Sequence, residues 1–338
     1  METTKISAVI LAAGKGTRMK SSQAKVLHEL NFQPMLHHVL DAVVPLDLHQ
    51  VVVVTGHQRQ VVEDSCKHYH VDFVEQTEQL GTGHAVLAAE EIVKDDVSVV
   101  MVLCGDTPLI RTETLHSMLS GHISSGHFLT VMTTEMDNPT NYGRILVDDR
   151  GYVSEIVEEK DASPDQKKIK NINAGIYCVN AEFLFASLKQ IGTDNKQGEM
   201  YLTDIVALAA AAEQPVHKYQ CPEPEEVLGV NSRHELSMAN SRLQSRVLEQ
   251  LMISGVSIDK PDTVTVEKSV CIGQDTVLYP NVYLSGKTII GSNCTVEPFC
   301  YITGSEIGNN VTIGAGSYVK GATLDNDIIL PPHTVMVP

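Results

Sequence analysis

The sequence of 338 residues contains no apolar run as long as the 18 or more residues that a membrane-spanning helix needs. It also has few basic residues, with 25 Lys and Arg against 42 Asp and Glu, so its formal net charge is -17. A chain this acidic is not suited to general binding of nucleic acids or of anionic membranes. We therefore expect neither a nucleic acid nor a membrane among its partners.

Motifs for disulfides and for histidine-bound metals are missing as well. The seven cysteines are scattered, odd in number and without a CxxC pair, which predicts reduced thiols in the cytoplasm. The fourteen histidines form no HxxxH or HExxH pattern, and we assign them no role. Because the first residues lead almost at once into an apolar run, we expect no secretory signal. The sequence thus predicts a cytoplasmic protein.

The first two-thirds of the chain alternate between apolar β-type runs and helical patterns. Continuous runs of Val and Ile between helices predict an α/β fold, with a mostly parallel sheet covered on both faces. Ligands of such sheets bind at the carboxyl ends of the strands. The expected strands are Ile6–Leu11, Val51–Thr55, Val71–Glu75, Val97–Leu103 and Phe128–Thr133, and the expected helices are Met35–Val44, Gln58–Tyr69, Gly83–Val93 and Thr112–Ser124.

A different pattern begins after residue 231. Ser232–Ser254 has helical spacing of apolar residues, and Gly255–Asp262 has the composition of a linker. From Val264 aliphatic residues recur every six positions, with one five-residue step at 306–310. A hexapeptide period is typical of a parallel β-helix, and roughly twelve hexads give about four coils. The expected domains are 1–231, a connection at 232–262 and a short β-helix at 263–338.

The segment Leu11–Lys25, LAAGKGTRMKSSQAK, combines glycines with basic residues directly after the first strand. A glycine-rich turn at that position exposes backbone N–H groups to a phosphate. The alternative is a tight strand-to-helix connection without a ligand. Phosphate binding is favoured because no Asp or Glu occurs between Lys5 and His28, although the whole chain is acidic. The cations of this loop are Lys15, Arg18, Lys20 and Lys25.

Two further motifs follow expected strands or precede an expected helix. Asp106 ends the third apolar strand, where it can cap a turn or hold Mg²⁺, and a phosphate loop at the same edge favours the metal. The segment 79–85, QLGTGHA, places two glycines before a helix. They indicate either an N-cap by Thr82 or a close approach of the backbone to a ligand.

Three other positions have an ordinary structural interpretation beside a functional one. The stretches Tyr142–Arg144 and Glu158–Lys160 are compatible with hairpin features, and Asn173 with a turn. None of the three indicates a site without further information.

Eight motifs occur in family order between Ile6 and Arg233: LAAGKGTRM…KVLH, EQLGTGHA, GDTPLI, YGRI, IVEEKDA, INAGIY, EMYLTDI and GVNSR. With them the chain resembles the bacterial sugar-nucleotide pyrophosphorylases. The LAAG variant of the first motif is similar to the N-acetylglucosamine-1-phosphate uridyltransferase branch. The resemblance implies a Rossmann-like nucleotidyltransferase domain, a linker helix and a short left-handed β-helix. It also implies that UTP and N-acetylglucosamine 1-phosphate react to give UDP-N-acetylglucosamine and pyrophosphate.

The same resemblance implies a role for each matching residue. Arg18 and Lys25 would be the catalytic cations that face the triphosphate, and Asp106 and Asn231 would coordinate Mg²⁺. The substrate-binding residues would be Leu11, Ala12, Ala13, Gly14 and Lys15 for the uridine and phosphates, Gln76, Gly81 and Thr82 for the nucleotide, and Gly143, Glu158 and Asn173 for the sugar.

The chain departs from the family pattern at several places. Ala24 stands where Pro is usual and predicts a more flexible loop. Cys104 replaces a common Tyr and Asn141 a common Gly, so another sugar 1-phosphate stays open as a substrate. A regulator that binds a nucleotide sugar without catalysis is a second alternative.

The repeat region carries its own expectations. The family's acetyltransferase needs later coils with a catalytic His, and we do not expect that activity because His333 is the sole histidine of the repeats. Left-handed β-helices commonly form parallel trimers through their flat faces. A homotrimer is therefore expected.

Overall fold

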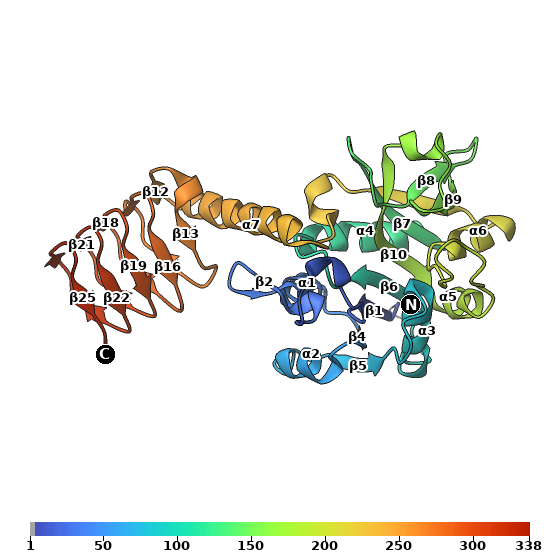
Figure 1. Ribbon diagram of the computed structural model, residues 1–338, viewed down its shortest axis with the longest axis horizontal. Coiled ribbons are helices and arrows are strands. Elements are labelled where there is room, and N and C mark those ends of the chain that lie inside the picture. Colours follow the sequence, from blue (N-terminus) through green and yellow to red (C-terminus); the bar gives the residue numbers. More distant parts are fainter. Residues whose placement is uncertain (1–3) are drawn as a thin grey trace. The chain divides into compact units, whose positions relative to one another are not determined.

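The computed structural model describes residues 4–338, which form two units. The first unit comprises the chain up to Glu29 together with Gln33–Leu236. The second comprises Leu30–Phe32 and Ser237–Pro338 (Figure 1). The helix α7 (Arg233–Ile253), expected at Ser232–Ser254, begins in the first unit and continues in the second.

A nine-stranded mixed sheet is the centre of the first unit. Seven strands follow the order β11-β7-β10-β6-β1-β4-β5, and β8 and β9 form a hairpin beside β10. Strands β6, β1, β4 and β5 are parallel, whereas β10 is antiparallel to both of its neighbours, β6 and β7. The strands are β1 (Ile6–Leu11), β4 (Gln50–Thr55), β5 (Asp72–Glu75), β6 (Val99–Cys104), β7 (Leu129–Glu135), β8 (Arg144–Val147), β9 (Val153–Val157), β10 (Asn171–Asn180) and β11 (Val216–Gln220).

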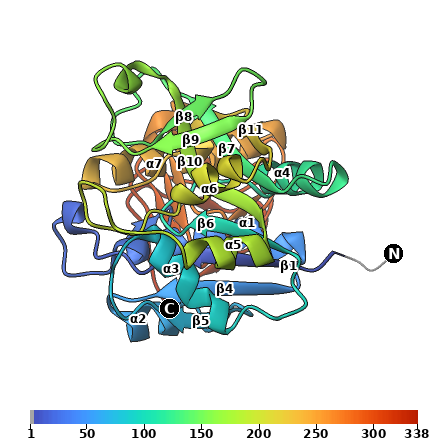
Figure 2. The same ribbon diagram turned by 90° about the vertical axis from the view of Figure 1, so that its right-hand side faces the viewer.

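Six helices cover this sheet on both faces. Neighbouring residues of β1 alternate between two cores, with Ile10 in one and Val9 in the other. The first core includes residues of α1, α2 and α4, and the second includes residues of α3, α5 and α6 (Figure 2). The helices are α1 (Met35–Val43), α2 (Arg59–Ser65), α3 (Thr82–Ala88), α4 (Thr112–Ser124), α5 (Ala181–Leu188) and α6 (Asp204–Ala211). The expectation of a mostly parallel sheet covered on both faces is confirmed.

Two helices differ from their predictions. The expected helix Gln58–Tyr69 ends at Ser65, because the chain turns so that the Tyr69 hydroxyl donates to Asp41 of α1 at 2.8 Å. The expected helix Gly83–Val93 is also divided, since α3 gives way to a 3-10 turn at Ala89–Glu91.

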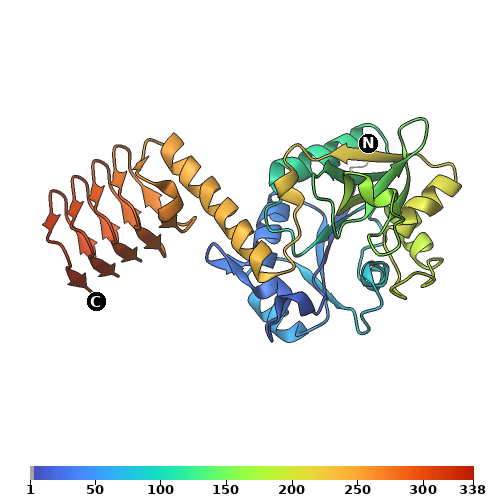
Figure 3. The same cartoon turned by 45° about the horizontal axis from the view of Figure 1, so that its top comes forward.

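The second unit contains a left-handed β-helix with three faces, whose coils are visible in Figure 3. Four complete coils and part of a fifth are present in the described chain, in agreement with the expected number. The first face consists of β12 (Ser257–Ile258), β15 (Val277–Leu278), β18 (Thr295–Val296), β21 (Thr312–Ile313) and β24 (Ile329–Leu330). The second consists of β13 (Thr265–Val266), β16 (Tyr283–Ser285), β19 (Tyr301–Thr303), β22 (Tyr318–Lys320) and β25 (Val335–Met336). The third consists of β14 (Cys271–Ile272), β17 (Ile289–Ile290), β20 (Glu306–Ile307) and β23 (Thr323–Leu324).

The register of the coils shows two features that the repeat pattern did not predict. Ser257–Ile258 lies in the expected linker, yet it pairs in parallel with β15 and thus begins the first face. The aligned residues are 18 apart in the first coils, as in the pair Tyr283 and Tyr301, but 17 apart in the pair Tyr301 and Tyr318. Five-residue steps separate the inward residues Ile302 and Ile307 and also Val319 and Leu324, so there are two such steps where one was expected.

The remaining short elements are a two-stranded ribbon of β2 (Glu29–Leu30) and β3 (Gln33–Pro34), together with 3-10 turns. None of the helices in residues 4–338 is long and apolar enough to cross a membrane.

Candidate active site

The glycine-rich loop and Asp106 lie at the same edge of the first sheet. Strands β1 and β6 are parallel neighbours with Leu11 opposite Cys104, so both strands end at the same level. The Gly105 N–H donates to the Leu11 carbonyl at 2.9 Å and joins the two loops. The expectation that both motifs follow carboxyl ends of parallel strands is confirmed, and this is the edge where α/β sheets bind ligands.

The loop after β1 is not a tight connection to a helix. It contains the 3-10 turns Thr17–Met19 and Lys25–Leu27, and the next α-helix begins only at Met35. The interpretation as a simple strand-to-helix turn is therefore wrong.

Two glycines of this loop have different functions in the packing. A Cβ on Gly14 would have no atom within 4 Å, so the backbone there is open to a ligand. A Cβ on Gly16 would lie 2.5 Å from Cβ of Lys25, and Gly16 has a φ of +60°. Gly16 thus leaves the space through which the Lys25 side chain passes.

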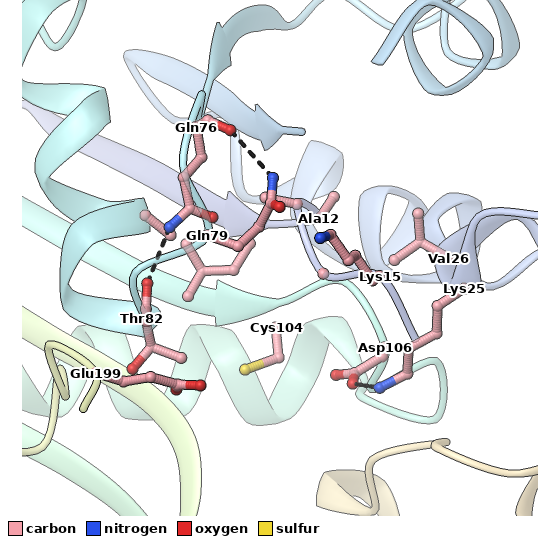
Figure 4. Close-up of a pocket in the computed structure, with 15 residues that line it drawn as sticks. Ala12, Lys15, Lys25, Val26, Gln76, Gln79, Thr82, Cys104, Asp106 and Glu199 are labelled. Atoms are coloured by element: carbon pink, nitrogen blue, oxygen red, sulfur yellow. Dashed lines mark hydrogen bonds and ion pairs between the residues drawn. The ribbon is translucent and has the colours of Figure 1, made fainter. Parts of the chain in front are cut away.

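A cavity of about 370 Å³ opens at this edge of the sheet (Figure 4). Ten of the residues proposed from the sequence line it, from four separate segments of the chain. They are Leu11, Ala12, Ala13, Gly14, Lys15, Lys25, Gln76, Gly81, Thr82 and Asp106. Five of the proposed residues are not among its lining residues, namely Arg18, Gly143, Glu158, Asn173 and Asn231.

Arg18 and Asn231 nevertheless belong to the same network as the cavity residues. The Lys25 ammonium forms an ion pair with Asp106 and donates to Oδ1 of Asn231 at 2.6 Å (Figure 4 shows the ion pair). The Arg18 guanidinium donates to the same Oδ1 at 2.8 Å. The Val230 N–H donates to the Asp106 carbonyl at 2.9 Å and ties this distant segment to the sheet edge. Two cations and two oxygen ligands therefore meet at one end of the cavity.

The oxygen atoms of Asp106 and Asn231 fit a hard divalent cation. Both lie within hydrogen-bonding distance of a single ammonium, so they converge on one point. One carboxylate and one amide oxygen are ligands that Mg²⁺ accepts. Among residues 4–338 no group of three or more His, Cys, Asp and Glu side chains could hold a metal. A metal here would take its other ligands from phosphates and water.

The segment around Gly81 is shaped by packing against another part of the chain. The Thr82 hydroxyl accepts from the Leu202 N–H at 3.0 Å and makes no N-cap, so the N-cap interpretation is wrong. Gly81 has a φ of +116°, and a Cβ there would lie 2.5 Å from the Met200 carbonyl oxygen. Glycine is therefore required at position 81 because the backbone there lies close to the backbone of Met200.

Gly143, Glu158 and Asn173 form a second group. The Asn173 N–H donates to the Gly143 carbonyl at 2.9 Å, and a Cβ on Gly143 would lie 3.6 Å from the Glu158 carboxylate. Gly143 and Glu158 flank the open end of the β8–β9 hairpin, where Arg144 pairs with Val157. The hairpin interpretation is therefore correct for both, but Asn173 lies within β10, so the turn interpretation is wrong there.

Electrostatics link this second group to the cavity. Burial raises the pKa of the Glu158 carboxyl, although the Thr203 hydroxyl donates to it at 3.3 Å. Burial also raises the pKa of the Cys104 thiol to about 12, and the neighbouring carboxylates of Asp106 and Glu158 contribute. Cys104 lines the cavity, and its raised pKa keeps the thiol neutral beside Asp106 and Glu158.

Sequence reasoning missed several cavity residues. Gln79 and Glu199 line the cavity, and both belong to motifs that were recognised without assigning them a role. Asn141, the replacement for a common Gly, has a φ of +73°, a conformation that Asn adopts more readily than most residues other than Gly. This replacement therefore preserves the turn before Gly143.

Comparison with known proteins gives a consistent result for both units. A family model described as "Nucleotidyl transferase" matches residues 7–223. The chain belongs to this family. A second model, "Bacterial transferase hexapeptide (six repeats)", matches 269–304 and 287–321.

Three relatives named "Bifunctional protein GlmU" cover most of this nucleotidyltransferase. The protein of Desulfotalea psychrophila is 47% identical over 302 residues, which are 89% of either chain. The Geotalea daltonii protein is 43% identical over 90% of this chain but 66% of its own length. That of Clostridioides difficile is 44% identical over 89% of this chain and 65% of its own. The expected family and enzyme class are confirmed by these matches.

Proposed function

We propose that this nucleotidyltransferase converts UTP and N-acetylglucosamine 1-phosphate to UDP-N-acetylglucosamine and pyrophosphate. A phosphate oxygen of the sugar phosphate attacks the α-phosphorus of UTP in line. Such a transfer needs no protein nucleophile, because positioning and charge neutralisation carry it. The observation that carries the proposal is the convergence of Lys25, Arg18, Asp106 and Asn231 at the end of a cavity beside the glycine-rich loop.

The orientation of Gln76 supports a preference for uracil. Its side-chain Nε2 donates to the Gly81 carbonyl at 3.0 Å and lies 3.2 Å from Nδ1 of His84. The amide oxygen is then the atom that can accept a hydrogen bond from a bound base. Uracil offers an N3–H donor, whereas cytosine has an acceptor at N3. Gln76 in this orientation therefore favours UTP over CTP.

The phosphates would lie along the loop from Leu11 to Lys25. The open backbone at Gly14 would receive phosphate oxygens, with Lys15 on the cavity wall. Lys25 and Arg18 would neutralise the charge that grows on the leaving pyrophosphate. A divalent cation, which we propose to be Mg²⁺, would be held by Asp106 and Asn231 and would supply further positive charge to the phosphate oxygens.

The sugar would bind beside Gly143, Glu158 and Asn173. The Asn173 side chain donates to the Tyr177 hydroxyl at 2.7 Å and accepts from the Gly175 N–H at 3.0 Å, so its position is fixed. Glu158 can accept from a sugar hydroxyl. A half-buried acceptor that loses its partner penalises a sugar without the matching hydroxyl.

The test is pyrophosphate release from a panel of nucleoside triphosphates and sugar 1-phosphates. We expect the highest kcat/KM with UTP and N-acetylglucosamine 1-phosphate, and loss of turnover when divalent metal is chelated. A faster reaction with glucose 1-phosphate would make that compound the proposed substrate in place of N-acetylglucosamine 1-phosphate. The replacements Cys104 and Asn141 left this alternative open. Tight binding of UDP-sugars without pyrophosphate release from any pair would instead favour the regulator.

Three expectations for the rest of the protein stay predictions. The absence of acetyl transfer is checked with acetyl-coenzyme A and glucosamine 1-phosphate, and N-acetylation would contradict it. The β-helix is proposed to assemble the chain into a homotrimer. A cytoplasmic location is proposed because UTP and sugar phosphates are cytoplasmic substrates.

A further inference from the structure

Gln58 holds the segment directly before Lys25. Its side-chain oxygen accepts from the Ala24 N–H at 2.7 Å, and its side-chain nitrogen donates to the Ser22 carbonyl at 2.5 Å. Ala24 is 2% exposed. Within the described chain, its backbone N–H has no acceptor closer in sequence than Gln58. One amide group thus satisfies two backbone groups of the loop, 34 and 36 positions away along the chain.

The turn that carries Gln58 also holds the beginning of the same loop. The His57 N–H donates to the Ala13 carbonyl at 3.3 Å, and a Cβ on Gly56 would lie 3.0 Å from Cβ of Ala13. Gln58 itself has a φ of +56°, at the position before α2. The turn 56–58 therefore fixes the phosphate loop at both of its ends, next to Ala13 and next to Lys25.

We propose that Gln58 is a positioning residue for Lys25, which it serves through the backbone of Ala24. The inference rests on the proposed role of Lys25 at the triphosphate. Ala24 precedes the 3-10 turn that Lys25 begins, and its carbonyl accepts from the Leu27 N–H at 3.0 Å. Holding the Ala24 amide therefore sets where the Lys25 side chain leaves the backbone.

The geometry of Ala24 explains how this chain manages without proline there. Ala24 has a φ of -53° and a ψ of 135°, values that proline also adopts. Proline would fix this φ through its ring. In Ala24 the φ is instead held by the hydrogen bond from its N–H to the side-chain oxygen of Gln58. The expectation of a more flexible loop at Ala24 thus omits a hydrogen bond formed by a distant residue. Without Gln58 a buried N–H would be left unpaired and φ would be free.

Four variants test the proposal. Gln58→Met removes both hydrogen bonds at nearly constant volume, and Ala24→Pro removes the N–H and fixes φ. Ala24→Pro/Gln58→Met combines them. Gln60→Met is the matched control, because Gln60 is exposed and, within residues 4–338, its amide bonds only to Asp64 of the same helix, at 3.0 Å.

We expect Gln58→Met to lower kcat roughly tenfold or more, because a small misplacement of a catalytic group is costly. KM for the sugar phosphate should change less than twofold, since the sugar group lies elsewhere. The double variant should regain most of the lost kcat, because Gln58→Met leaves no hydrogen bond at the Ala24 N–H for proline to displace. Ala24→Pro alone should fall below the double variant, because its ring displaces the Gln58 oxygen that lies 2.7 Å from the Ala24 nitrogen. Gln60→Met should stay within about twofold of the parent chain. If Gln58 had only a structural role, Gln58→Met would lower Tm, and the added proline would not restore kcat.

Amide hydrogen exchange at Ala24 gives a readout that does not depend on turnover. We expect slow exchange in the parent chain and fast exchange in Gln58→Met. The proposal is overturned if Gln58→Met keeps the parent's kcat, if its Ala24 exchange is unchanged, or if proline fails to restore kcat. If the parent chain has no activity with UTP, the proposed function fails, and the exchange measurement alone decides whether Gln58 holds Ala24.

Discussion

We propose Lys25 as the residue on which the chemistry of the site depends most. Its ammonium contacts Asp106 and Asn231, and its path through the loop requires a glycine at position 16. We expect Lys25→Ala to lower kcat by at least about a hundredfold, the typical effect of losing one charge-stabilising group. Pyrophosphate release measures it, and circular dichroism should show an unchanged fold. Lys20→Ala, in the same loop but exposed, is the control and should remain active.

The same contacts would make Lys25 a competitor of the proposed divalent cation. An ammonium and a metal ion cannot occupy the point between Asp106 and Asn231 together. Lys25→Met should therefore bind Mn²⁺ more tightly, by about fivefold if the half-buried ion pair contributes about 1 kcal/mol. Electron paramagnetic resonance of Mn²⁺ without substrates measures the affinity. Lys15→Met should change it less, and weaker binding to Lys25→Met would show that the oxygens do not form the site.

At the level of elements, the β8–β9 hairpin keeps Glu158 in a partly desolvated position. Burial raises its pKa in the folded state above the unfolded value of about 4.3. The neutral carboxyl therefore contributes stability below pH 4, and this contribution is lost as the pH rises through the folded pKa.

Glu158→Gln should show this pH dependence directly. The variant should match the parent chain in free energy of unfolding near pH 4 and exceed it near pH 8, since no charge is buried. Urea unfolding across this range measures the difference. A constant difference for Glu158→Gln would show that its charge is well solvated.

Helices and strands were predictable where the local sequence pattern agrees with the burial of the residues in the fold. Helix α4 has the predicted bounds Thr112–Ser124, and the apolar run of β1 alternates between two cores. The end of α2 was missed because Tyr69 is held by Asp41, a tertiary contact. The site followed the same rule. The loop and Asp106 were recognised from local motifs. The role of Gly16, however, depends on how Lys25 packs in the folded loop, and the role proposed for Gln58 depends on Ala24, which is distant in the sequence.

For the whole molecule, assembly is expected to use the flat faces of the β-helix. The outward side chains of the first face include Val277, Thr295, Thr312 and Ile329, without a charge in the described strands. Those of the third face include Glu306. A face without charge is the better candidate for burial between copies.

Light scattering should give three times the chain mass of 36.9 kDa. Thr312→Glu, on the first face, should lower this mass, because a buried unpaired charge is costly. Thr323→Glu, at an exposed position of the third face, should leave it unchanged. A monomeric parent chain would refute the trimer, and a trimeric Thr312→Glu would exclude the first face.

The two five-residue steps of the β-helix indicate where this fold accepts a longer or shorter chain. Both occur between the second and third faces, at Thr303-Gly304-Ser305 and at Lys320-Gly321-Ala322, whereas an earlier coil has Ser285-Gly286-Lys287-Thr288. Lys287 is the additional residue of the longer corner. Its deletion should leave Ile290 facing inward and cost little in Tm, while deletion of Thr295 would reverse the side chains of its strand. This corner is therefore where we expect the repeat to accept the gain or loss of a residue without losing the stack.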